Sequence, residues 1–157
     1  MARSIAEELK QTRPFQTPSE EASIALIRTA HLLRRKFEAA VEKEGITHQQ
    51  YNVLRILRGA RGPMPTMEIA DRMIEPSCGI TRLISTLETG GFVRREQWTG
   101  DRRQVLCQIT PAGQHVIERL AAPLQAVVAT IGAEFTEQEF QTLIALLGRL
   151  RETLETP

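Results

Sequence analysis

The segment from Pro76 to Arg103 restricts the possible folds of this chain because it places a basic hairpin directly after an amphipathic helix. The helix is predicted to begin at Ser77, a good N-cap, and to end at the Gly90-Gly91 pair. Its apolar face has the i, i+3, i+4, i+7 spacing of a packed stripe: Ile80, Leu83, Ile84 and Leu87. The opposite face has small polar residues and one arginine: Cys78, Thr81, Arg82 and Ser85. Taken alone, this is an ordinary amphipathic surface helix. Its outer face would also fit a DNA major groove, where an arginine can pair with a guanine edge or a phosphate.

The residues before this helix have the pattern of a helix-turn-helix. Residues 47–50, Thr-His-Gln-Gln, form a capping box and predict a helix that ends near Gly59. Thr66 is predicted to cap a short helix over residues 67–74, and residues 75–77 form the turn into the next helix. Short helices joined by a turn to a polar-faced helix are typical of this motif.

The residues after the helix predict a two-stranded wing. Strands are expected over residues 92–97 and 104–109, because the second alternates apolar and polar side chains. Residues 98–103 form the tip of this hairpin. The hairpin is locally basic, since Glu96 and Asp101 are outnumbered by four arginines: Arg94, Arg95, Arg102 and Arg103. A wing directly after a helix-turn-helix predicts a winged helix.

Long helices are predicted on both sides of this region. Thr17 and Pro18 begin a helix that ends near Gly45, which at about 1.5 Å per residue is about 40 Å long. A small core cannot cover such a helix, so part of it should pack against something else, such as a partner subunit. Two further helices, after Thr110 and Thr136, have apolar residues at the 3-4-3-4 spacing of helices that pack along their length.

The composition limits the class of protein. The 157 residues are 41% hydrophobic and 25% charged, which is typical of one compact domain or two closely joined halves. The formal net charge is +1, so a nucleic-acid interface must rest on a local basic patch. No apolar run reaches the ~20 residues of a membrane span and the first residues lack an apolar signal core, so we expect a cytoplasmic protein.

The sequence lacks the usual motifs of catalysis and metal binding. Cys78 and Cys107 fit no disulfide framework or metal-ligand spacing, and the three histidines are scattered. No HExxH motif, GxSxG motif or phosphate-binding glycine loop occurs. We therefore expect no enzymatic activity, no metal and no cofactor. Cys107 alternates with apolar neighbours and is predicted to lie in the core.

Together these motifs resemble the MarR family, the multiple-antibiotic-resistance type of bacterial transcription regulators. The resemblance covers roughly residues 20–155. The residues that support it most specifically are Ile80-Thr81-Arg82-Leu83-Ile84, Leu87, Gly91-Phe92-Val93, Asp101-Arg102-Arg103 and Thr110-Pro111-Ala112-Gly113. The start of the helix at residues 47–51 also looks like the corresponding helix of the family.

The resemblance implies a mainly α fold with a small two- or three-stranded β wing, in which a winged helix-turn-helix is joined to a helical dimerisation domain. The expected divisions are a flexible N-terminus (1–16), a helical dimerisation region (17–46 and 111–157) and a winged helix-turn-helix domain (47–110). The implied function is that of a homodimeric repressor that binds double-stranded DNA. Its operator would be a pseudo-palindrome with half-sites about 10 bp apart.

The resemblance also implies which residues contact DNA. The helix from Ser77 would lie in the major groove. Arg103, braced by Asp101, would enter the minor groove, because a buttressing carboxylate fixes the direction of a guanidinium. Phosphate contacts would come from Arg102 and from Arg94 or Arg95. The predicted DNA-binding residues are Ser77, Cys78, Gly79, Thr81, Arg82, Ser85, Arg94, Asp101, Arg102 and Arg103.

Many members of this family bind small aromatic or phenolic molecules between the dimer and DNA-binding domains, and such binding weakens DNA affinity by a population shift. The candidate residues for such a pocket are His31, Phe37, Tyr51 and Met73. Two alternatives stay open. One is a redox switch at Cys78, where the start of a helix would activate a thiol, although a small groove-facing residue is the simpler role. The other is a protein-interaction module that kept the fold without binding DNA.

Overall fold

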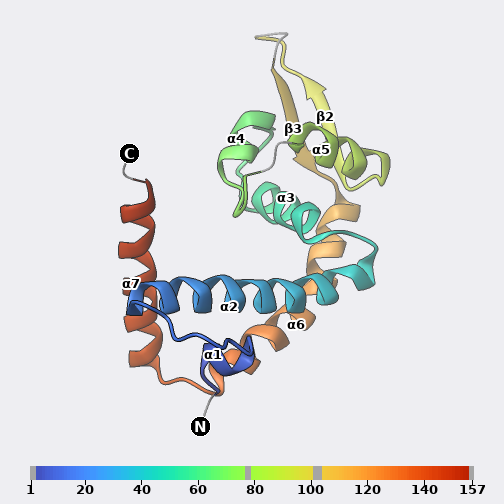
Figure 1. The fold of residues 1–157 in the computed structure, drawn as a ribbon. Helices are drawn as coiled ribbons and strands as arrows, with labels where there is room; N and C mark the ends of the chain where they lie inside the picture. The colour runs from blue at the N-terminus through green and yellow to red at the C-terminus, as the bar shows by residue number, and fades with distance from the viewer. Residues whose placement is uncertain (1–2, 77–78, 101–103, 156–157) are drawn as a thin grey trace.

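The computed structural model describes residues 3–76, 79–100 and 104–155. This part of the chain is mainly helical and contains a small antiparallel sheet with the strand order β1-β3-β2 (Figure 1). The predicted fold class, mainly α with a small β wing, is confirmed. The elements are α1 (Ile5–Glu8), α2 (Pro18–Val41), the 3-10 helix η1 (Glu42–Glu44), α3 (His48–Gly59), β1 (Met64–Pro65), α4 (Thr66–Asp71), α5 (Ile80–Thr89), β2 (Val93–Gln97), β3 (Val105–Ile109), α6 (Pro111–Gly132) and α7 (Glu137–Glu155).

Most of the predicted capping residues begin the helices. At α3 the capping box is complete, since the Thr47 amide donates to Gln50 Oε1 over 2.8 Å and the Gln50 amide donates to Thr47 Oγ1 over 3.2 Å. At the start of α2, by contrast, only half of a capping box is formed. The Glu20 amide donates to Thr17 Oγ1, but the Glu20 carboxylate accepts from the Gln16 amide, one residue earlier.

The helix predicted to begin at Ser77 begins later. Gly79 is the N-cap of α5, with φ −120° and ψ 26°, and the first helical hydrogen bond runs from the Leu83 amide to the Gly79 carbonyl over 3.0 Å. Glycine is tolerated at an N-cap and is costly inside a helix, so the helix starts after it. The preceding helix is also shorter than predicted, because α4 ends at Asp71.

The core forms where α3 and α5 pack against the sheet and α6 packs against α3. The apolar face predicted for α5 is confirmed, since Ile80, Ile84 and Leu87 are buried and Leu83 is packed against them. Each fully buried side chain of this size contributes about 1.5–3 kcal/mol. This burial fixes the rotation of α5 about its axis. Cys107 on β3 is fully buried, as predicted.

The start of α6 is fastened to the turn that follows α5. The Thr110 hydroxyl donates to the Gly91 carbonyl over 2.7 Å and accepts from the Gly113 amide over 3.2 Å. Gly113 is needed for close packing, because a Cβ there would collide with the Phe92 carbonyl oxygen and lie 2.8 Å from Cγ1 of Ile109. The Thr-Pro-Ala-Gly motif therefore joins the long helix to the wing.

The helices outside the winged-helix region extend away from it. Figure 1 shows α2 running across the molecule beneath α3, while α6 leads away from β3 toward the turn into α7. No residue of α7 is buried within the described chain. Among the described helices none is, by itself, both long and apolar enough to cross a membrane, although α6 and α7, bent by 100°, meet that test as a pair.

Candidate nucleic-acid interface

The outward face of α5 is polar, as the sequence predicts. Thr81 and Arg82 are exposed and Ser85 is half-buried. The Thr86 and Thr89 hydroxyls instead donate to carbonyls of their own helix, at Arg82 and Ser85. Within the described residues the Arg82 guanidinium has no ion-pair partner. It is therefore available to a base edge or a phosphate.

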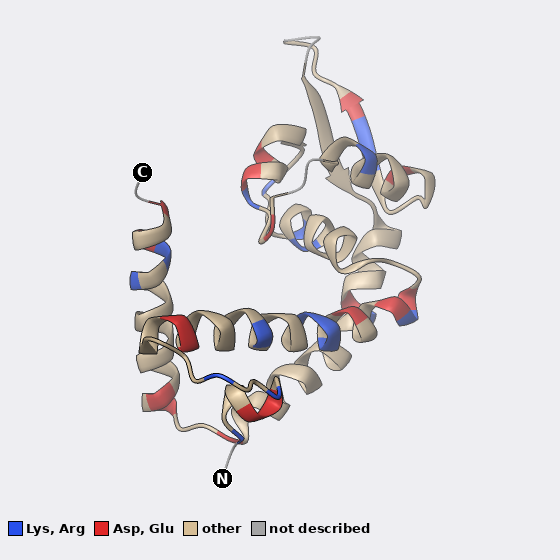
Figure 2. Ribbon diagram, viewed as in Figure 1, with Lys and Arg blue, Asp and Glu red and all other residues tan. Residues whose placement is uncertain are grey.

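The two arginines of β2 lie in different surroundings. Arg94 is exposed; it pairs with Glu96 at 2.9 Å and donates to Gln108 Oε1 on β3 at 2.9 Å. Arg95 pairs with Glu88 of α5, and the hydrogen bond from Arg95 to Glu88 raises the pKa of Arg95. Figure 2 shows a basic stretch of β2 next to α5. Arg94 is thus the more accessible of the two for a phosphate contact.

Several predicted contact residues lie outside the residues that the structure describes. They are Ser77, Cys78, Asp101, Arg102 and Arg103. Gly79 is described; it is exposed at the start of α5. The minor-groove role of Arg103 and the redox role of Cys78 stay predictions.

A groove separates α5 from the wing and the start of α4. Its volume is about 450 Å³, and Thr81 lies on its wall together with Arg95. The other lining residues are Pro65, Thr66, Met67, Ile84, Gln104 and Val105. The groove therefore runs between the outward face of α5 and the wing, with residues of both on its walls.

A larger hollow lies between α2 and the winged-helix region, with a volume of about 810 Å³. We call it the α2–α5 hollow. It is lined by Arg34, Glu38, Glu42, Ile46, Thr47, His48, Gln49, Gln50, Glu75, Gly79, Arg82, Leu83 and Thr86. Most of these side chains are charged or polar, and Arg82, on the outward face of α5, is one of them.

The four residues predicted to line a ligand pocket are not among the described lining residues of this hollow. Phe37 and Tyr51 instead stack on His48, which does line the hollow, with ring centroids 5.8 and 6.4 Å from that of His48. His31 is exposed on α2. Met73 is buried, and its Sδ accepts from Asn52 Nδ2 at 3.7 Å.

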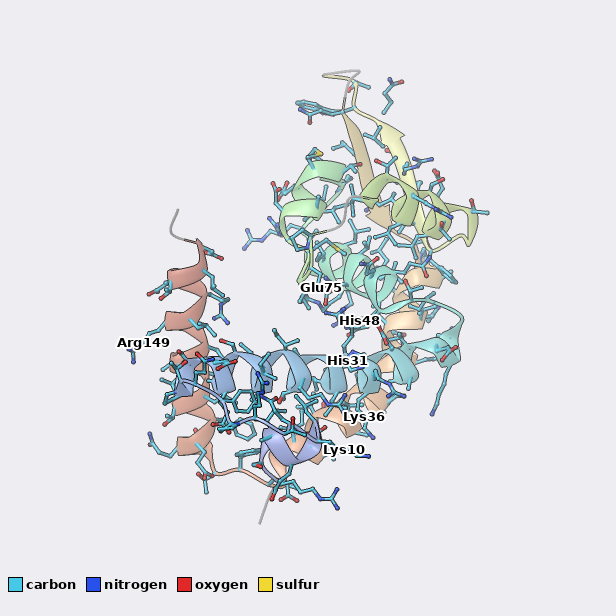
Figure 3. All side chains as sticks on the ribbon, in the orientation of Figure 1. Lys10, His31, Lys36, His48, Glu75 and Arg149 are labelled. Carbon is cyan, nitrogen blue, oxygen red and sulfur yellow. The ribbon has the colours of Figure 1, made fainter. Side chains whose placement is uncertain are left out.

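Three residues that line this hollow were not predicted from the sequence: Arg34, His48 and Glu75. Figure 3 shows His48 and Glu75 on the side of the winged-helix region that faces α2, with His31 on α2 itself. The capping box at residues 47–50 placed His48 in the first turn of a helix, which was a usable signal. No sequence pattern marks Glu75, which lies in the connection between α4 and α5.

The described residues offer little for redox or metal chemistry. Burial raises the pKa of the Cys107 thiol, which lies 3.6 Å from the Thr66 hydroxyl. A buried thiol that resists ionisation is a poor nucleophile. Within residues 3–76, 79–100 and 104–155, no group of three or more His, Cys, Asp or Glu side chains could hold a metal ion.

A helix-turn-helix whose last helix presents a polar face beside a β wing defines a winged helix-turn-helix DNA-binding protein. A family model, described as the MarR family, matches residues 46–105. The HTH-type transcriptional regulator YkoM of Bacillus subtilis (strain 168), itself described as uncharacterized, is 30% identical over 109 residues, which are 69% of this chain and 70% of the relative.

A solved structure points to the same family. The MarR transcription factor from Planctomyces limnophilus is 31% identical, with a TM-score of 0.67 over 86% of this chain and 98% of that one. The homoprotocatechuate degradative operon repressor of Escherichia coli is 26% identical over 133 residues, which are 82% of this chain and 86% of the relative. The chain belongs to the MarR family of winged-helix transcriptional regulators. Its relatives are regulators of transcription, not enzymes.

Proposed function

We propose that the chain is a repressor that binds a pseudo-palindromic operator as a homodimer, and that a small molecule releases it. In this proposal residues 47–110 bind DNA and residues 17–46 and 111–157 form the dimer. Residues 1–16 form the N-terminal segment, which is expected to be flexible. The term repressor is supported by the name of the Escherichia coli relative.

The outward face of α5 is the observation that supports DNA binding best. Its apolar side is buried, so Thr81, Arg82 and Ser85 point away from the core. In the proposal Arg82 contacts a base edge or a phosphate in the major groove, and the wing lies over the adjacent minor groove. Arg94 would exchange Glu96 for a phosphate. This exchange is inexpensive, because an exposed ion pair is worth only about 0–1 kcal/mol.

The exposed apolar side chains of α7 support a dimer. Leu143, Ile144 and Leu146 are 46–58% exposed, and Leu154 is 75% exposed. Phe135, just before the helix, is also exposed. Several large apolar side chains left exposed on one helix are typical of an interaction site. A second copy of α7, together with α2 and α6, would cover it.

The α2–α5 hollow is the proposed site of the effector, a small aromatic or phenolic molecule. Arg34 and Arg82 could bind its polar groups, and the stacked rings of Phe37, His48 and Tyr51 lie beside it. Arg82 faces both this hollow and the DNA. A molecule bound there would therefore favour one orientation of α5 over another.

Selection of bound fragments from random DNA tests the proposal. We expect enrichment of a pseudo-palindrome whose half-sites are about 10 bp apart. The selection is then repeated with single phenolic compounds present. A compound that is an effector should reduce the amount of DNA recovered with the protein. A protein that enriches no sequence at low salt would instead be a protein-interaction module on this fold.

A further inference from the structure

We infer that the ion pair between Arg34 and Glu75 sets the angle between α2 and the winged-helix region, and therefore the half-site spacing that the dimer prefers. The inference rests on the proposed dimeric DNA binding. Arg34 Nη2 of α2 lies 2.6 Å from Glu75 Oε1, in the connection between α4 and α5. Both side chains line the α2–α5 hollow, and Figure 3 shows Glu75 on the side that faces α2.

The pair is a further attachment between α2 and the winged-helix region, which already contact each other near the C-terminal end of α2. The contacts at that end are buried Ala40 and Val41, followed by buried Ile46, and the stack of Phe37 on His48 of α3. Arg34 lies seven residues before Val41, which is about 10 Å along the helix. Arg34 also lies about one helical turn before Phe37, so the pair adds a contact farther from the buried end of α2, where a small displacement changes the angle most.

Glu75 belongs to a packed part of the winged-helix region. Met73, two residues earlier, is buried and accepts a hydrogen bond from the buried Asn52 amide of α3. On the other side of Glu75, α5 is held by its buried face, including Ile80 and Ile84. A force on Glu75 is therefore transmitted to α5.

The other described ion pairs do not join these two bodies. Arg28–Glu8 joins the N-terminal segment to α2, and Arg119–Glu44 lies within the proposed dimerisation region. Arg72–Glu68, Arg94–Glu96 and Arg95–Glu88 lie within the winged-helix region. In the part of the chain that the structure describes, Arg34–Glu75 alone crosses from one to the other.

The size of the effect follows from the exposure of the pair. Arg34 and Glu75 are 47% and 39% exposed, so the pair changes an equilibrium constant by no more than about fivefold. A change of this size shifts the populations of different orientations of the winged-helix region, but it does not restrict the protein to one of them. Arg34 and Glu75 are therefore positioning residues that act through α5.

The test measures spacing preference with the full-length protein and its selected operator. Duplexes carry the half-sites at the selected spacing or with one base pair added or removed. The variants are Arg34→Glu, Glu75→Arg and the exchanged pair Arg34→Glu/Glu75→Arg. Arg35→Glu is the matched control, because Arg35 is the next residue of α2, is exposed and has no ion-pair partner among the described residues.

We expect each single variant to reduce the ratio of affinities for the selected and altered spacings by about twofold to fivefold. The exchanged pair should restore the ratio, while Arg35→Glu should leave it unchanged. Thermal unfolding should shift by no more than about 4 °C in any variant, so that all of them are folded in the binding assay. If the wild type clearly prefers one spacing and Arg34→Glu keeps the same preference, this inference is overturned while the proposed function stands. A wild type that binds no DNA would overturn the proposed function and this inference with it.

Discussion

The guanidinium of Arg95 on β2 pairs with the carboxylate of Glu88 in the last turns of α5. The wing and the helix that would enter the major groove are thereby tied together. Both side chains are about one-third exposed, at 32% and 36%, so the pair is better shielded from solvent than the Arg94–Glu96 pair farther along β2. The two pairs should therefore differ in their contribution to stability.

Replacing Glu88 by Gln should lower the free energy of unfolding by about 0.5–1 kcal/mol, because Arg95 loses its charged partner. Urea denaturation measures this change. Glu96→Gln is the control, since Glu96 is 56% exposed and its pair should contribute less. A larger loss in Glu96→Gln than in Glu88→Gln would contradict this account of the wing.

Replacing Gly113 by Ala should destabilise the protein by about 1–3 kcal/mol, because the new methyl group would collide with the Phe92 carbonyl. Alanine also favours helix by about 1 kcal/mol, but overpacking against backbone outweighs this gain. Gly132→Ala, at the end of the same helix, has nothing within 4 Å of its added Cβ. Urea denaturation should show that the free energy of unfolding of Gly132→Ala equals or slightly exceeds that of the wild type. An equal loss of unfolding free energy at both positions would contradict the close packing described for Gly113.

Replacing Arg82 by Ala should weaken binding to the selected operator by about 1–3 kcal/mol and relax the base preference at one position. The side chain is exposed, so folding should be unaffected. Binding titrations on operators with single base changes measure both quantities. An equal loss on every sequence would make Arg82 a phosphate contact rather than a base contact.

Replacing Glu44 by Gln should make stability less sensitive to acid. Hydrogen bonds from Arg119 lower the pKa of the Glu44 carboxyl below its ordinary value of 4.5. A lowered pKa in the folded state gives stability that is present above 4.5 and is lost as pH falls through the folded-state pKa. Thermal unfolding between about pH 3 and pH 6 should therefore be flatter in Glu44→Gln. Glu118→Gln, next to Arg119 on α6 and exposed, is the control that removes a carboxyl without removing the Glu44–Arg119 pair.

Truncation after Gly132 removes α7 and should convert the dimer into a monomer. The exposed leucines and isoleucine of α7 have no cover within the described chain, so we expect them to form much of the dimer contact. Sedimentation velocity measures the result. A truncated protein that remains dimeric would place the dimer contact on α2 and α6 instead.

The parts of the fold with strong local signals were predictable from sequence. The 3-4 spacing of Ile80, Leu83, Ile84 and Leu87 gave the buried face of α5, and Thr47 and Thr110 gave the starts of α3 and α6. These signals succeed because helix periodicity and capping depend on neighbouring residues.

Other features depend on the packing of distant segments. The strand β1 has two residues, too few for any alternation, and it exists because Met64 pairs with Cys107. Ser77 is the better capping residue by type, yet Gly79 is the N-cap of α5. Arg34 and Glu75 are 41 positions apart in the sequence, and only the fold brings them together.

Fluorescence anisotropy with a labelled duplex from the region upstream of the protein's own coding sequence tests the central claim most directly. We predict that the full-length protein binds with two chains per operator. The logarithm of its binding constant should fall linearly with the logarithm of salt concentration between about 50 and 200 mM, with a slope of several units. Binding that is absent at the lowest salt concentration would contradict the account of α5 and the wing as a DNA interface.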